Sequence, residues 1–186
     1  MRSERARHYK IIFSGTVGAG KSTAIAALSD IPPVSTEAVA SDETAKLKRT
    51  TTVAMDYGVL NLPDGEKVML YGTPGQERFS FMWDILSEGG IGLVLLINNA
   101  NPDPLADLQG YLTAFKDFIS KTAVAVGVTH MDRAEAPDLD AYRTRLASLG
   151  HQPPPAVFRV DARSRDDVAM LVKALLYTLN PGLIDA

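Results

Sequence analysis

Short apolar segments alternate along the whole chain with longer segments in which apolar residues recur every three or four positions. The short segments are mostly apolar, which is typical of parallel strands buried on both faces. They cover residues 10–14, 68–71, 91–97, 123–128 and 156–160. This alternation predicts one α/β domain over residues 1–186, with helices on both faces of a sheet.

Three of the longer segments carry signals for the start or the end of a helix. Asp103 is a candidate N-cap followed by Pro104, and Ser164 with Asp167 forms a capping-box-like start. Gly150 ends the middle helix. The helices are expected over residues 104–119, 138–149 and 164–179.

One pair of strands interrupts the alternation. Residues 52–60 and 66–71 flank the turn-forming segment 61–65, which contains Pro63, Asp64 and Gly65, and this pattern predicts an antiparallel hairpin. We therefore expect a three-layer fold with a mixed sheet of six strands, one of them an antiparallel edge strand. A ligand site is expected at the carboxyl ends of the strands.

Composition narrows the classes of function. The chain has 186 residues, 46% of them hydrophobic, 19 Lys and Arg against 22 Asp and Glu, and no cysteine. This near-neutral charge does not favour nucleic acid, and the lack of cysteine excludes disulfides and thiol catalysis. Residues 1–9 are expected to form a flexible basic tail. Because no apolar run is long enough to span a bilayer and Arg2 stands where myristoylation needs glycine, we expect a cytoplasmic protein without an intrinsic membrane anchor.

A glycine-rich loop carries the clearest chemistry. Residues 15–22 match G-x-x-x-x-G-K-S between a predicted strand and a predicted helix, which is the context of a phosphate-binding P-loop. Lys21 would meet the outer phosphates, and Ser22 would provide a hydroxyl ligand for Mg²⁺. The expected nucleotide-binding residues here are Gly15, Val17, Gly18, Ala19, Gly20, Lys21, Ser22 and Thr23.

A second segment resembles a known family. Residues 72–79, G-T-P-G-Q-E-R-F, are similar to the D-T-A-G-Q-E-R-F segment of Ras-like small GTPases. The chain resembles more closely the prokaryotic MglA-like group, whose members work beside roadblock-type proteins, and the resemblance covers nearly the whole sequence. It implies a Ras-like P-loop fold, a Gly75 amide at the γ-phosphate, and catalysis by Lys21 and by Gln76, which orients the attacking water.

The resemblance extends to residues 48–57, which are similar to the switch I segment of the family. It implies that Thr52 is a second Mg²⁺ ligand, with Thr51 as the alternative, because a slip of one residue exchanges the faces of a strand. An arginine near the γ-phosphate would stabilise the transition state. Arg49 is the preferred candidate, and Arg78 is the other.

Two loops resemble the base-binding loops of the family. Thr129, His130 and Asp132 stand in its N-K-x-D motif, and only the aspartate is retained. A carboxylate at Asp132 can accept two N–H groups from guanine, and His130 could stack on the base. Asp161, Ala162 and Arg163 resemble its S-A-K loop and are expected beside the base as well.

Departures from the family pattern affect the expected mechanism. Gly72 replaces the aspartate that holds Mg²⁺ through water, which predicts weaker metal binding, and Val17 predicts slow turnover. The sequence thus predicts a small GTPase that binds GTP and GDP with Mg²⁺ and hydrolyses GTP slowly as a switch in bacterial or archaeal signalling. A poorly hydrolysing nucleotide-dependent scaffold, or a P-loop ATPase or kinase, is the alternative.

An apolar cluster follows Gln76. Phe79, Phe81, Met82 and Trp83 either pack under the switch helix or form an exposed patch. An exposed patch that rearranges with the nucleotide would bind a partner. The resemblance implies a GTPase-activating or effector protein of roadblock type.

Overall fold

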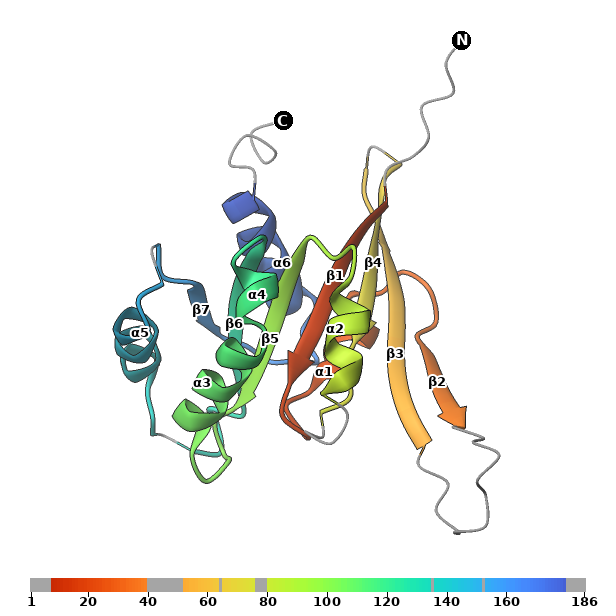
Figure 1. Cartoon of the computed structure of the whole chain (residues 1–186). Helices are drawn as coiled ribbons and strands as arrows, with labels where there is room; N and C mark the ends of the chain where they lie inside the picture. Colours follow the sequence, from red (N-terminus) through yellow and green to blue (C-terminus); the bar gives the residue numbers. More distant parts are fainter. Residues whose placement is uncertain are drawn as a thin grey trace, which may run out of the picture.

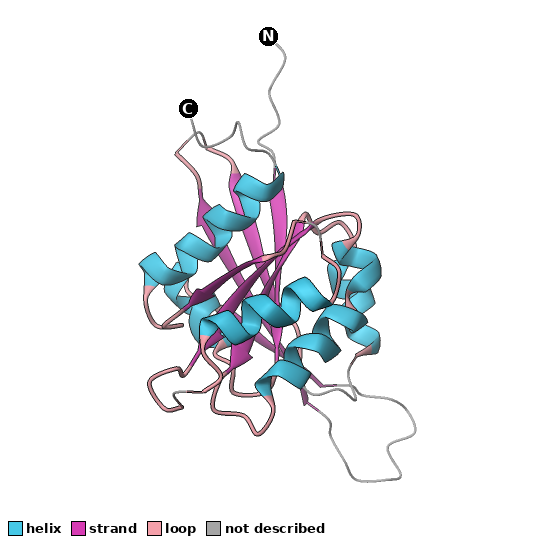
Figure 2. Ribbon diagram, turned by 90° about the vertical axis from the view of Figure 1, so that its left-hand side faces the viewer, coloured by secondary structure: helices cyan, strands magenta, loops and turns pink. Residues whose placement is uncertain are grey.

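The computed structural model describes residues 8–39, 52–63, 65–75, 80–134, 136–151 and 153–179, without the side chains of residues 35–39, 52–54 and 81. Its strands are β1 (His8–Gly15), β2 (Val34–Val39), β3 (Thr52–Asn61), β4 (Lys67–Gly72), β5 (Gly92–Asn98), β6 (Ala123–Thr129) and β7 (Ala156–Arg159). Its helices are α1 (Lys21–Leu28), α2 (Phe81–Ser87), α3 (Pro104–Ala114), α4 (Lys116–Ile119), α5 (Leu139–Ser148) and α6 (Arg165–Leu179). Figures 1 and 2 show one twisted sheet between two layers of helices. The predicted three-layer α/β class is confirmed.

The strand order in the described part of the chain is β2-β3-β4-β1-β5-β6-β7. Strand β1 runs parallel to β4 and β5, and β6 and β7 continue the parallel part. Strand β3 runs antiparallel to β2 and to β4. The hairpin prediction is confirmed, and its register places Asp56 opposite Gly72.

Two details of the predicted sheet differ from the structure. The described sheet has seven strands, and the edge position is taken by β2, so the antiparallel strand β3 is internal. Segment 34–39, V-S-T-E-A-V, has no continuous apolar run, and its pairing depends on backbone hydrogen bonds, which leave no pattern in the sequence. His8 and Tyr9, assigned to the flexible tail, belong to β1 and pair with Lys67 and Val68. Residues 1–7 lie outside the described part.

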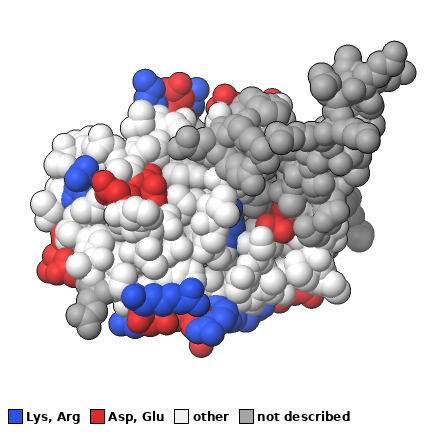
Figure 3. Space-filling view, turned by 90° about the horizontal axis from the view of Figure 1, so that it is seen from below, with Lys and Arg blue, Asp and Glu red and all other residues white. Residues whose placement is uncertain are grey.

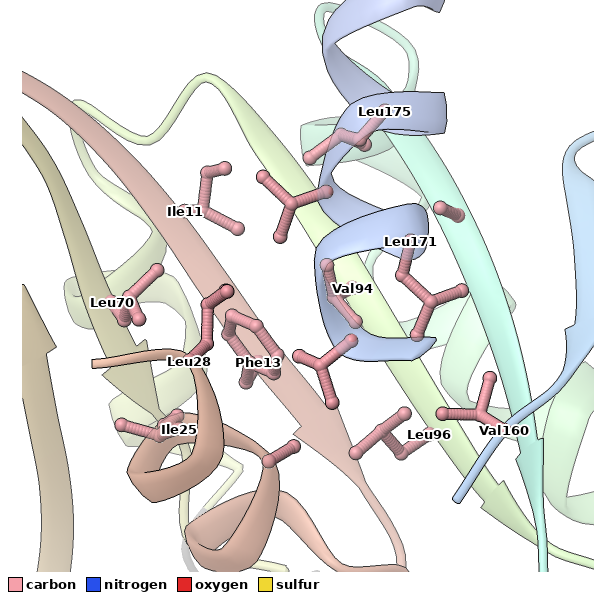
Figure 4. Packing of buried hydrophobic residues seen from close by; sticks show 14 of the residues in the cluster. Ile11, Phe13, Ile25, Leu28, Leu70, Val94, Leu96, Val160, Leu171 and Leu175 are labelled. Atoms are coloured by element: carbon pink, nitrogen blue, oxygen red, sulfur yellow. The ribbon is translucent and has the colours of Figure 1, made fainter. Parts of the chain in front are cut away.

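Both faces of the sheet are buried by helices. On one face, α1 and α6 cover a core that includes Ile11, Phe13, Ile25, Leu70, Val94, Leu96, Leu171 and Leu175 (Figure 4). On the other face, helices α2, α3 and α5 contribute Trp83, Leu108, Tyr111, Leu112, Tyr142 and Leu146 to a second core. Because both faces are buried, the central strands β5 and β6 are apolar at nearly every position, as predicted.

The predicted helix starts are present. The carboxylate of Asp103 accepts from the amide of Ala106 at 3.0 Å, and Ser164 and Asp167 form reciprocal contacts at the start of α6. The helix expected over residues 104–119 is divided at Phe115 into α3 and α4. None of the helices in the described ranges is long and apolar enough to cross a membrane.

The parallel strands end together at one edge of the sheet. Strand β1 ends at Gly15, β4 at Gly72 and β6 at Thr129, and all three lead into loops that were predicted to bind nucleotide. Figure 3 views this end of the molecule, where charged side chains gather mostly near the rim of the described surface and a smaller group of both signs lies near the middle. The candidate site is therefore built here.

Candidate nucleotide-binding site

The loop between β1 and α1 has the backbone of a phosphate-binding turn. Gly15, Gly18 and Gly20 have φ angles of 140°, 77° and 94°, values that side chains disfavour. A Cβ at Gly15 would lie 1.9 Å from the carbonyl oxygen of Leu96, so the neighbouring strand also requires glycine. The loop leads into the first turn of α1, where free backbone N–H groups attract anions.

Lys21 lies folded into this loop. Its Nζ donates to the carbonyl oxygens of Gly15 at 2.7 Å and Thr16 at 2.8 Å, and the residue is only 9% exposed. Burial lowers the pKa of the Lys21 ammonium to about 8, although the Asp56 carboxylate acts in the opposite direction. An anionic phosphate beside Nζ would favour the charged form.

Ser22 meets a carboxylate that sequence reasoning did not select. Its Oγ donates to Oδ2 of Asp56, in strand β3, at 2.5 Å. A hydroxyl and a carboxylate are hard oxygen donors of the kind that Mg²⁺ prefers, so the residues present fit this ion. The signal was available in the sequence: Asp56 is the charged residue in the otherwise uncharged segment 52–61.

Segment 72–75 forms hydrogen bonds with strand β1 and lies against the P-loop. The hydroxyls of Thr73 and Ser14 form a buried hydrogen bond of 2.7 Å, and the amide of Thr73 donates to the carbonyl of Phe13 at 2.9 Å. A Cβ at Gly75 would lie 2.7 Å from Lys21 Nζ and 2.9 Å from the amide nitrogen of Val17. The backbone of Gly75 therefore lies directly against the predicted phosphate site.

Two buried aromatic residues hold the same segment from the other side. Trp83 Nε1 donates to the carbonyl of Pro74 at 3.0 Å, and the Tyr111 hydroxyl donates to the carbonyl of Gly75 at 3.1 Å. The two rings stack with a centroid distance of 5.0 Å. Trp83 is 6% exposed, because its ring packs against α3, so it contributes little to the predicted docking patch. Phe79 and the side chain of Phe81 lie outside the described part, and Met82 is half-buried.

The residues predicted to bind the base surround a pocket of about 510 Å³. Its walls include Gly20, Thr23, Thr129, His130, Asp132, Asp161, Ala162 and Arg163. The structure thus brings together residues from the P-loop, from the end of β6 and from the end of β7.

The base-binding loops are tied to the P-loop by two polar contacts. The Thr129 hydroxyl donates to the carbonyl of Ala19 at 3.0 Å. His130 has a φ of 57°, and its Nε2 lies 3.1 Å from the carbonyl oxygen of Gly18. Residues that replace the asparagine and lysine of the N-K-x-D pattern therefore still connect the two halves of the site.

The charged side chains that line this pocket are mostly exposed. Arg163 binds Asp161 through its guanidinium at 2.7 Å, and the two side chains are 81% and 45% exposed. Hydrogen bonds from Arg163 hold the pKa of the Asp161 carboxyl at about 2. Asp132 lines the same pocket without a hydrogen bond to either residue among the described contacts. Its carboxylate is therefore available to a ligand.

A second pocket, of about 800 Å³, adjoins the P-loop on its other side. Its lining includes Val17, which is 62% exposed, together with Gly75, Trp83, Asp107 and Tyr111. The predicted base-binding residues thus line the first pocket, whereas Val17 and Gly75 line the second.

Four residues predicted to act in catalysis or metal binding belong to stretches that the structure does not describe. Gln76, Arg49, Arg78 and Thr51 lie outside the described residues. Thr52 begins β3, where its backbone pairs with Val39, but its side chain is not described. The roles of these residues remain predictions.

Comparison with known proteins identifies the family. A family model described as conserved hypothetical ATP binding protein matches residues 13–148, more than half of the chain. Among curated proteins, the uncharacterized protein MJ1339 of Methanocaldococcus jannaschii is 35% identical over 79 residues, which are 39% of this chain and 51% of that protein. The chain thus spans about half the length of this relative.

This match corrects the resemblance to Ras-like and MglA-like small GTPases, which is wrong as a family assignment. P-loops and short segments such as T-P-G-Q bind phosphate through backbone geometry. Similar short sequences therefore recur in families that share only phosphate binding. The Ras pattern fails at Gly72, Thr129 and His130. These positions lie in segments that are specific to the Ras-like family. The chain is a nucleotide-binding P-loop protein and belongs to the family of conserved hypothetical ATP binding proteins.

Proposed function

We propose that this protein is a Mg²⁺-dependent nucleoside triphosphatase that prefers GTP. The observation that carries the base preference is the Asp132 carboxylate, which lines a pocket contiguous with the P-loop through Gly20. Guanine presents two adjacent N–H donors to such a carboxylate, whereas adenine presents no matching pair. The description of the family as ATP binding favours ATP as the second candidate.

The phosphate end supports hydrolysis by positioning and electrostatics. Lys21 would exchange its two carbonyl partners for phosphate oxygens, and the first turn of α1 would stabilise the bound anion. The backbone of Gly75 faces the same point as Lys21 Nζ. When bound, Mg²⁺ would neutralise charge on the outer phosphates. Gln76 follows directly in the sequence and is the proposed water-positioning residue.

Turnover without a partner is expected to be slow. None of the described residues beside Gly75 is an arginine, and unassisted or cis-assisted phosphoryl transfer of this kind proceeds at about 10⁻⁴ to 10⁻² s⁻¹. Single-turnover phosphate release from GTP, measured with and without the Gln76→Ala substitution, tests this step. Retention of intact GTP over many hours would instead support a nucleotide-dependent scaffold.

The base preference is tested by competition. GTP and ATP should displace a fluorescent nucleotide from the protein, with GTP at least about tenfold more effective, because unmatched hydrogen-bonding groups penalise adenine. Asp132→Asn should lose this preference and gain affinity for xanthosine triphosphate, whose carbonyl accepts from the new amide. Asp166→Asn is the matched control, because this exposed carboxylate on α6 lines neither pocket. Tighter binding of ATP by the wild-type protein would contradict the preference for GTP.

A further inference from the structure

The end of β4 lacks the carboxylate that commonly lies beside the metal in P-loop proteins. Gly72 stands at this point, and a Cβ there would lie 3.0 Å from Ile25 Cδ1, 3.1 Å from Asp56 Cβ and 3.2 Å from Asp56 Oδ2. The space that a side chain at Gly72 would enter is therefore already bordered by a carboxylate from the neighbouring strand. The described geometry leaves little room for acidic side chains at both positions.

Asp56 reaches the P-loop from this position. Its Oδ2 accepts the hydroxyl proton of Ser22 at 2.5 Å, although the two residues are 34 positions apart. A hydroxyl whose proton is held by a carboxylate keeps its oxygen lone pairs free for a cation, and such a partner also raises the basicity of the ligand. Asp56 is half-buried, in a strand that is paired on both sides.

We propose that Asp56 is the positioning carboxylate of the metal site, replacing from strand β3 the acidic residue that is absent at Gly72. It orients Ser22 toward Mg²⁺ and adds a negative charge beside the ion. The inference rests on the proposed Mg²⁺-dependent nucleotide binding but not on the identity of the base. It also removes the expectation that metal binding is weakened by Gly72.

The test is the Mg²⁺ dependence of nucleotide binding by the full chain. A fluorescent nucleoside diphosphate is bound in excess chelator and in rising Mg²⁺, for the wild type, Asp56→Asn and the control Asp117→Asn. Asp117 is an exposed carboxylate on α4, outside the residues that line either pocket. Loss of a partner outside the ligand shell weakens metal binding by about 10–100-fold, so Asp56→Asn should raise the half-saturating Mg²⁺ by at least about tenfold.

The assay distinguishes a structural role of Asp56 from a role in positioning the metal site. If Asp56 positions the metal site, affinity without Mg²⁺ should be unchanged or higher in Asp56→Asn, because a negative charge near the phosphates is removed. A disrupted fold would lower affinity with and without the ion. In a Ser22→Ala background the further effect of Asp56→Asn should be small, because the two residues act as one unit. If Asp56→Asn changed the Mg²⁺ midpoint equally with and without Ser22→Ala, the proposal that Asp56 acts through Ser22 would be overturned.

Exchanging Asp56 and Gly72 gives a test in which the amino-acid composition stays the same. Asp56→Gly alone should raise the half-saturating Mg²⁺ at least as much as Asp56→Asn does, and Asp56→Gly combined with Gly72→Asp should lower it again, since the carboxylate returns to the same space. A double variant that keeps the Mg²⁺-free nucleotide affinity of the wild type, and so accommodates the new side chain beside Ile25, but has a Mg²⁺ midpoint no better than that of Asp56→Gly would overturn the claim that Asp56 replaces an acid at Gly72. An unchanged Mg²⁺ midpoint in Asp56→Asn would overturn the role of Asp56 while leaving nucleotide binding intact. A wild type that binds no nucleotide at any Mg²⁺ concentration would overturn the proposed function as well.

Discussion

The phosphate end and the base end of the site differ in how their residues are held. At the phosphate end, Lys21 and Thr73 are nearly inaccessible, and glycines approach backbone atoms so closely that no side chain fits. At the base end, Asp161 and Arg163 are exposed side chains on loops. Affinity should therefore depend on the phosphate end, where substitutions disturb packed atoms. Selectivity should depend on the base end, where substitutions change only what the ligand meets.

The largest effect that separates the two ends is expected from Lys21→Ala. The variant loses the ammonium that lies in the loop, and hydrogen bonds to charged groups contribute about 1.5–3 kcal/mol each. Loss of more than one such bond to phosphate should weaken nucleotide binding by about a hundredfold or more. Displacement of a fluorescent nucleotide measures this change, and Lys116→Ala, at an exposed lysine of α4, is the control. An affinity within threefold of the wild type would contradict the assigned phosphate site.

Gly75→Ala should affect the phosphate end more selectively. The new Cβ would meet Lys21 Nζ at 2.7 Å and the Val17 amide nitrogen at 2.9 Å, and the latter is backbone that cannot move aside cheaply. Overpacking costs about 1–3 kcal/mol, which corresponds to a loss of about 5- to 150-fold in triphosphate affinity. Diphosphate affinity should change little, because the contact concerns the outermost phosphate.

The neighbouring helix offers a matched glycine for this experiment. Gly110 lines the same pocket on α3, and a Cβ there would have no atom within 4 Å. Gly110→Ala should leave both affinities unchanged and stabilise the fold by about 0.5–1 kcal/mol. Calorimetric titration with a non-hydrolysable triphosphate and with the diphosphate distinguishes the two variants. Equal losses for both ligands in Gly75→Ala would place Gly75 away from the outermost phosphate.

Tyr111→Phe should produce a smaller effect at the phosphate end. It removes the hydroxyl that donates to the carbonyl of Gly75 at 3.1 Å and keeps the stacking with Trp83. A hydrogen bond of this kind contributes about 0.5–1.5 kcal/mol. The ratio of triphosphate to diphosphate affinity should therefore fall by about two- to tenfold.

Tyr142→Phe is the control for this substitution. It also loses a buried phenol hydrogen bond, to Asn99 Oδ1 at 2.7 Å, but Asn99 and Tyr142 line neither pocket. It should lower the midpoint of thermal unfolding without changing the affinity ratio. If the two variants changed the ratio equally, the contact between Tyr111 and Gly75 would have no special role.

The distance along the chain between contacting residues explains what could be predicted from the sequence. The P-loop and the helix starts at Asp103 and Ser164 depend on residues within a few positions of one another, so local spacing encodes them. The contact between Ser22 and Asp56 joins residues that are distant in the chain, and it depends on strand register. No local pattern contains this information.

The hairpin nevertheless made that register accessible. Its turn pairs Asn61 with Lys67, and counting five residues back along β3 and five forward along β4 places Asp56 opposite Gly72. The predicted hairpin thus contained both the sheet topology and the residue opposite the missing carboxylate, although only the topology was predicted from it. Family membership could not be obtained in this way, because the phosphate-binding segments are constrained mainly by backbone geometry.

The smallest effect is expected at the base end, from Arg163→Ala. Its salt bridge with Asp161 is exposed, and such pairs contribute little because solvent screens them, so the stability of the fold at pH 7 should change little. The change should appear instead in the titration of Asp161. The folded-state pKa, about 2, lies below the ordinary value of 3.8, so the pair stabilises the fold fully above pH 3.8 and loses this effect as the pH falls toward 2.

Removal of the Arg163 side chain should raise the pKa of Asp161 toward its ordinary value and reduce that acid dependence, while the backbone N–H of residue 163 still donates to the carboxylate. NMR titration of the Asp161 carboxyl measures the shift directly, while unfolding at pH 7 should be nearly unchanged. Arg165→Ala is the contrasting arginine variant, because this side chain donates to the carbonyl of Leu28 at 2.8 Å and to Asp30 at 2.7 Å, joining α6 to the end of α1. It should clearly lower the thermal midpoint. A larger loss of stability in Arg163→Ala than in Arg165→Ala would show that the exposed loops of the base end help to hold the fold.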